Sequence, residues 1–205
     1  MLSEIRTGSI TTTDGAVNPA RSDKTGALVV TDAHGRYTEA VLRGNIFIAS
    51  NSATQALSTN STTATGLILT NPAGSTKNLA LLRISVALAS LPAGQSTLIL
   101  TGNTNPIATA VTHTTPLTIQ SALLGSQNKS SGLADSAATI PNATIIRVIP
   151  AGTAATVASS TAFPPMIDID LGGEIILTPG TCISLQALTT AITVVASISW
   201  EEISI

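Results

Sequence analysis

The sequence predicts an all-β protein: a jelly-roll-like antiparallel β-sandwich preceded by an extended N-terminal arm. From residue 45 onward, apolar and polar residues alternate in short segments of strand length. Turn motifs such as `NPAG`, `LPAG` and `TPG` stand between these segments. No segment sustains the apolar period of a helix. About eight to ten strands at this spacing predict two packed sheets or a barrel, and a jelly roll suits that number.

Ten segments carry the strand pattern. In the longest early one, apolar side chains recur at every second position from Leu82 to Leu88, whereas Arg83 and Ser85 take the opposite face, as a half-buried strand requires. The core must be built from aliphatic residues, because the chain has one Trp, one Tyr and two Phe. The predicted strands are residues 45–50, 65–70, 78–89, 96–102, 116–123, 143–150, 166–171, 174–178, 181–187 and 191–203.

The segment `PMIDIDLGGEIILTPGTCISL` predicts a hairpin with an acidic outer face. Gly172 and Gly173 supply the two positive φ angles of a tight turn between two strands. Asp168 and Asp170 then share one face, about 6 to 7 Å apart. They could hold a calcium ion, which needs six to eight oxygen ligands. A solvent-facing hairpin, or a salt link to an arginine of a neighbour, accounts for them better.

Charge divides the chain into an arm of residues 1–43 and a sandwich body of residues 44–205. The arm holds five basic and five acidic side chains, half of the 20 charged residues of the whole chain. Such a segment cannot bury enough apolar area to order itself alone. Within it, `ALVVT` predicts a short strand, and `RYTEAVLRGN` predicts a single helical turn ended by Gly44 or a second strand, with the helix favoured.

The body is nearly uncharged, since residues 44–76 and 84–128 contain no Asp, Glu, Lys or Arg. A solvated surface usually carries roughly a quarter to a third charged residues, so we expect a homo-oligomer that hides part of this surface. A net charge of −2 gives no field that would attract nucleic acid. The first residues lack the apolar segment of a signal peptide, and no segment reads as a membrane span. The single cysteine, Cys182, is expected to be a partly buried strand residue.

No catalytic group is predicted, and no metal or cofactor is expected. His34 and His113 stand in turn and loop sequences without the context of an activated nucleophile, so both are interpreted as ordinary surface or turn residues. Trp200 could be a sugar-stacking platform beside two glutamates, but its parity with Ile198 indicates a core or subunit-interface residue. The sequence therefore predicts a protein that is not an enzyme.

Three segments together resemble virion proteins of tailed bacteriophages, above all capsid decoration or cement proteins. They are `RSDKTGALVVTDAHGRYTEAVLRGN`, `GEIILTPGTCISL` and `SISWEEI`. The resemblance implies a trimeric β-sandwich, made in the host cytoplasm, that binds the major capsid protein on the outer surface of the virion through an extended segment. On this interpretation `GALVVT` adds a strand to an exposed edge of a partner. The arm residues expected to bind it are Arg21, Lys24, Leu28, Val29, Val30, Arg36, Tyr37 and Arg43.

Two other functions stay open. A tail-fibre or head-fibre module would recognise glycans of the host surface, for which Trp200 and Tyr37 are the candidate aromatic residues. A hydrolase would need a poised base in a cleft, and the sequence assembles none.

Overall fold

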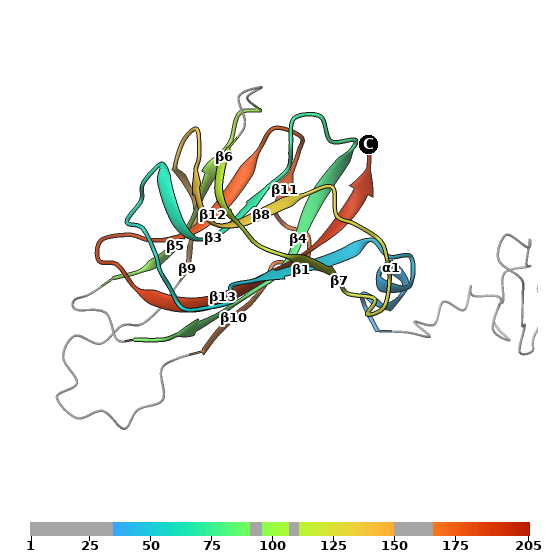
Figure 1. The fold of residues 1–205 in the computed structure, drawn as a ribbon, viewed down its shortest axis with the longest axis horizontal. Coiled ribbons are helices and arrows are strands. Elements are labelled where there is room, and N and C mark those ends of the chain that lie inside the picture. Colours follow the sequence, from blue (N-terminus) through green and yellow to red (C-terminus); the bar gives the residue numbers. More distant parts are fainter. Residues whose placement is uncertain (1–34, 91–95, 107–110, 150–165) are drawn as a thin grey trace, which may run out of the picture. The chain divides into compact units, whose positions relative to one another are not determined.

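The computed structural model describes residues 35–90, 96–106, 111–149 and 166–205, and these residues form two packed antiparallel sheets (Figure 1). The seven-stranded sheet has the order β10-β4-β13-β1-β7, with β11 also paired to β4 and β2 to β13. The six-stranded sheet has the order β6-β8-β3-β12-β5-β9. The elements are α1 (Thr38–Leu42), β1 (Ile46–Ser50), β2 (Gln55–Ala56), β3 (Thr63–Thr70), β4 (Lys77–Leu88), β5 (Leu98–Asn103), β6 (Thr112–Pro116), β7 (Ile119–Ser121), β8 (Leu133–Thr139), β9 (Thr144–Ile149), β10 (Met166–Asp170), β11 (Ile176–Leu177), β12 (Cys182–Ala187) and β13 (Thr193–Ser204).

The strands pair in the nested order that defines a jelly roll. β1 pairs with β13, β3 with β12, β4 with β10, and β5 with β9, and every pair is antiparallel. The chain therefore behaves as one long double ribbon that folds over on itself to give two sheets. The predicted all-β sandwich is confirmed. The arm predicted over residues 1–43 lies outside the described residues up to residue 34, and the compact unit that contains both sheets begins at Ala40.

Three further strands are inserted between β5 and β9 and extend one side of the sandwich. β7 pairs with β1 at the edge of the seven-stranded sheet. β8 pairs with β3 in the other sheet, and β6 pairs with β8 outside it. The sequence interpretation missed β6 and β8, because `THTTP` and `LADSAAT` offer small and polar residues in place of the large aliphatic ones that mark a strand.

The pairing of β4 with β13 contains a bulge that shifts the inward-facing residues of β4. Ser199 is opposite Arg83, and the next residue, Trp200, is opposite Leu81, so Leu82 is the extra residue. Leu81 on one side of the bulge and Ile84 on the other both enter the main core. The predicted single face from Leu82 to Leu88 is thus correct from Ile84 onward and wrong at Leu82, which is buried but lies outside the main cluster.

The main core lies between the inner faces of the two sheets and is almost entirely aliphatic. Its aromatic pair is Phe47 and Trp200, which are opposite each other on β1 and β13 with ring centroids 6.3 Å apart. Both side chains are buried. The core interpretation of Trp200 is correct, and its burial leaves no face for a sugar.

The predicted hairpin at Gly172–Gly173 is wrong, although both glycines have positive φ angles, 54° and 87°. β10 and β11 both pair antiparallel with β4, with Asp170 opposite Arg83 and Ile176 opposite Ala80. The chain therefore keeps its direction through the turn. A reversal would require β10 and β11 to pair with each other, whereas here the turn only adds extra residues to a strand that continues along β4.

The predicted helical turn before the sandwich is confirmed as α1, and it ends as predicted at Gly44. Gly44 has a φ of 71°, its N–H donates to Val41, and the N–H of Asn45 donates to Ala40. This pair of hydrogen bonds closes a helix with a left-handed residue, which glycine adopts without steric cost.

We expect Trp200→Ala to lower the free energy of unfolding by about 3 to 5 kcal/mol, because it leaves a large cavity in a core that has one other aromatic side chain. Leu124→Ala is the matched control: Leu124 is 89% exposed, and its substitution should change stability by less than about 0.5 kcal/mol. Urea unfolding followed by circular dichroism measures both. Equal effects of the two substitutions would contradict the described core.

Candidate functional site

The predicted arm residues fall mostly outside the described part of the chain. Arg21, Lys24, Leu28, Val29 and Val30 precede residue 35. Of the remaining three, Arg36 places its guanidinium 5.1 Å from the centre of the Tyr37 ring, which is a cation–π distance. Arg43 is exposed and follows α1. The structure therefore neither assembles nor disperses the predicted binding set, which stays a prediction.

The contacts of Asp168 on β10 do not support the interpretation of the two aspartates as a calcium site. Asp168 accepts a hydrogen bond from the Ser85 hydroxyl at 2.7 Å and lies 3.4 Å from the Arg83 guanidinium. The carboxylate is thus already satisfied by neighbours on β4 of the same chain. Among the described residues, no group of three His, Cys, Asp or Glu side chains is placed to hold a metal ion. No described helix has the length and apolarity needed to cross a membrane.

His113 is not the ordinary surface or turn residue that the sequence predicted. It lies on β6, and its Nδ1 is 2.5 Å from Oδ2 of Asp135 on β8. Its side chain is 28% exposed, whereas that of Asp135 is completely buried. The other carboxylate oxygen of Asp135 has no hydrogen-bond partner. The pair links the inserted strands β6 and β8 on the outer face of their sheet. Sequence reasoning could not find it, because the two residues are 22 positions apart on strands without apolar alternation.

That outer face carries a second, smaller core. Ile68 and Cys182 are buried there with Val111, Ile140 and small alanines, and Ala143 packs against them. The short connection from β8 to β9 supplies Ile140 and Ala143, because it joins strands that lie near opposite ends of the sheet order. Burial raises the pKa of the Cys182 thiol, which keeps it neutral and unreactive. Cys182 is therefore a strand residue, as expected, but it is fully buried and not partly buried.

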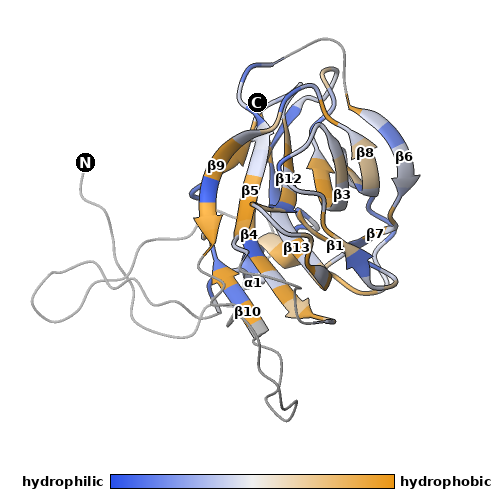
Figure 2. Cartoon of the chain, turned by 90° about the vertical axis from the view of Figure 1, so that its left-hand side faces the viewer, coloured by the Kyte–Doolittle hydropathy of each residue, from blue (hydrophilic) through white to orange (hydrophobic). Residues whose placement is uncertain are grey.

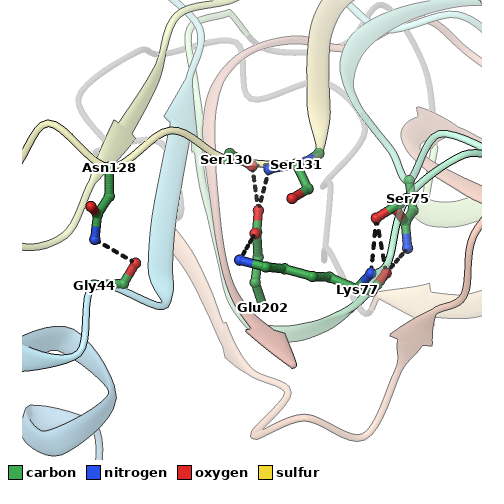
Figure 3. A network of polar contacts seen from close by, with 9 residues as sticks. Gly44, Ser75, Lys77, Asn128, Ser130, Ser131 and Glu202 are labelled. Atoms are coloured by element: carbon green, nitrogen blue, oxygen red, sulfur yellow. Dashed lines mark hydrogen bonds and ion pairs between the residues drawn. The ribbon is translucent and has the colours of Figure 1, made fainter. Parts of the chain in front are cut away.

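Glu202, near the end of β13, forms an anchor for the loop that leads into β8 (Figure 3). Its buried carboxylate accepts hydrogen bonds from the hydroxyl of Ser130 and the backbone N–H of Ser131, both at 2.7 Å, and pairs with Lys77 at 3.1 Å. Burial alone would raise the pKa of Glu202, but these hydrogen bonds and the Lys77 charge outweigh it and hold the pKa below its ordinary value. In its ionised form, Glu202 therefore holds together three segments: β13, the start of β4 and the loop before β8.

A shallow groove crosses the outer face of the seven-stranded sheet. Ser50, Ser197, Ser85 and Asp168 are aligned across β1, β13, β4 and β10, each opposite the next in register. Together with Ala87 and Val195 they line a hollow of about 470 Å³, which we call the serine groove. Small side chains at these positions leave the backbone of the sheet close to the surface. Among the described residues that line the groove none is basic, and the one carboxylate, that of Asp168, is paired with Arg83 beside it.

The outermost strand on the opposite sheet, β9, presents exposed aliphatic residues. Ile145, Ile146 and Val148 are 40%, 38% and 57% exposed, and we call these three residues the apolar edge. Figure 2 shows β9 as the last strand of its sheet, apolar on either side of a hydrophilic band. Arg147 pairs with Glu174, which follows β10 in the other sheet. The sequence identified β9 as a strand but did not indicate that β9 is the last described strand of its sheet.

Comparison with known protein families, with curated proteins and with solved structures found no match for this chain.

We expect the Glu202 anchor to make stability pH-dependent. Because its folded-state pKa is depressed, the stabilisation is fully present above the unfolded-state pKa of about 4.3 and is lost as the pH falls below it toward the folded-state value. At neutral pH, Glu202→Gln should cost about 1 to 3 kcal/mol of unfolding free energy. Urea unfolding at pH 7 and at pH 3 measures the effect, which should shrink at the lower pH. A pH-independent difference would show that the charge of Glu202 is not what stabilises the loop.

Substitution of His113 should destabilise the fold, because it removes the hydrogen-bond partner of the buried Asp135 carboxylate. We expect His113→Ala to lower the free energy of unfolding by about 2 to 4 kcal/mol. Adding Asp135→Asn should recover part of this loss, since a buried amide costs less than a buried charge. Thermal unfolding of the two variants and of the native chain provides the comparison. A double variant less stable than His113→Ala alone would contradict the role of the pair.

Proposed function

We propose that this protein is a structural component of a bacteriophage virion, without enzymatic activity, that binds the major capsid protein on the outer capsid surface and stabilises the particle. The observation that supports this most directly is the division of charge. Half of the charged residues belong to the first 43 positions, and the rest of the chain is a nearly neutral jelly roll. The phage-like sequence segments favour a capsid as the partner lattice.

The described surfaces are consistent with association. The serine groove and the apolar edge are open, and the one carboxylate in the groove, Asp168, is paired with Arg83, which suits contact with protein surfaces. The two buried acids have structural roles: Asp135, bonded to His113, joins β6 to β8, and Glu202 holds the loop before β8. In this proposal the body self-associates, as a trimer by the resemblance, and the charged arm attaches it to capsid subunits. Paired charges then contribute register more than strength.

Deletion of residues 1–30 tests the proposal. We expect the body to stay folded and oligomeric while its affinity for capsids falls at least about tenfold, equivalent to about 1.4 kcal/mol. Co-sedimentation with capsids of the encoding phage, stripped of this protein, measures the binding. A chain in which a Gly/Ser linker of equal length replaces residues 1–30 is the matched control, because it keeps the length and removes the side chains.

Unchanged capsid binding by both altered chains would move the attachment site to the sandwich. Absence of capsid binding by the native chain, together with binding to immobilised host-surface glycans, would instead support a tail-fibre or head-fibre module.

A further inference from the structure

The apolar edge and the serine groove differ in shape, but neither has a strong charge. The apolar edge projects from β9, the last strand of the six-stranded sheet, and the serine groove is a hollow on the outer face of the seven-stranded sheet. Neither surface carries an unpaired charge: Asp168 in the groove pairs with Arg83, and Arg147 within β9 pairs with Glu174. Since they lie on different sheets, one copy of the chain can use both at once.

The apolar edge stands out among the sheet edges in the described part of the chain. β6 is polar and ends at Pro116, β7 has three residues, and β10 carries Asp168 and Asp170. Proline, shortness and charge are the usual means by which an edge strand is kept from associating. β9 carries three exposed aliphatic side chains instead. Exposed aliphatic side chains grouped in this way are expected where another protein surface covers them in the functional assembly.

The β9 edge is better suited to docking by side chains than to extension of the sheet. Its pairing with β5 contains a bulge, because Leu100 is opposite Arg147 while Thr101 is opposite Ile145, which makes Ile146 the extra residue. A bulge interrupts the regular row of free N–H and C=O groups that an added strand needs. Contact through Ile145 and Val148 does not depend on that row.

The serine groove can receive these side chains. Its volume of about 470 Å³ is about three times the roughly 150 Å³ of an apolar cavity that admits benzene. Serine and alanine side chains on its floor allow close approach, and the exposed side chain of Val195 provides an apolar contact. The hydroxyl of Ser85 already donates to Asp168, so covering that hydroxyl leaves its donor satisfied.

We propose that the apolar edge of one copy docks into the serine groove of a second copy, so that successive copies close into a ring. The contact is heterologous: each copy offers one edge and one groove, and a ring leaves neither exposed. This inference rests on the self-association in the proposed function and names the surfaces that produce it.

Mixing two complementary variants tests the inference. Val148→Glu places a charge on the edge and leaves the groove intact, and Ser197→Glu blocks the groove and leaves the edge intact. Each should raise the dissociation constant for self-association at least about tenfold, because an uncompensated carboxylate would be buried. Light scattering should show each variant alone at the monomer mass of 20.6 kDa. Their equimolar mixture should form a 1:1 dimer and nothing larger, since one intact edge and one intact groove remain.

Leu124→Glu is the control, because it adds the same charge at a residue that is 89% exposed and belongs to neither surface, and it should keep the native mass. Circular dichroism verifies folding, and Ile145→Glu replaces Val148→Glu if the latter unfolds. A monomeric native chain, two variants that both keep the native mass, or a mixture that stays monomeric would overturn the inference. An edge-to-edge contact would leave Ser197→Glu at native mass and would overturn it too. Capsid binding by the monomeric variants is a separate measurement, so the proposed function can survive the loss of this contact.

Discussion

The fold depends on the pairing of β4 with β13, two twelve-residue strands in the middle of the seven-stranded sheet. β10 and β11 are placed along β4, while β1 and β2 are placed along β13. One bulge at Leu82 sets which side chains of β4 face the core. The same ladder aligns Ser197 with Ser85 and so forms the floor of the serine groove. A slip of one residue would turn both the core and the groove inside out.

Buried acids hold the parts that apolar packing does not specify. The loop before β8 has little apolar content, and Glu202 fixes it through Ser130 and Ser131. β6 and β8 are weak strands by composition, and Asp135 with His113 joins them. Isolated buried charges are costly, whereas buried charges with several hydrogen bonds give one specific arrangement. Through Glu202, the stability of the loop before β8 is therefore sensitive to pH.

Sequence patterns predicted the features that depend on the local spacing of apolar residues. They failed for the features that are decided by which distant strands pair with each other. Aliphatic alternation identified β4, β9 and β13, and the Gly44 stop identified the end of α1. The Gly172–Gly173 pair was predicted as a hairpin, because positive φ angles are local while the choice of partner strand is not. The groove and the apolar edge could not be predicted either. Ser50, Ser85 and Ser197 are ordinary strand residues until the register places them in one row.

The ion pairs of the body explain how a nearly neutral surface remains compatible with a specific fold. Of its four basic residues, Lys77, Arg83 and Arg147 each pair with an acid on another segment. Charges that are engaged in this way fix neighbouring strands and leave little net field on the faces between them. Uncharged faces in turn lower the desolvation cost of contact with another protein. In the proposed self-association, contacts between such faces would be selected by shape, with the aliphatic edge of one copy placed against the hollow of small residues that the register of β4, β13 and β1 forms.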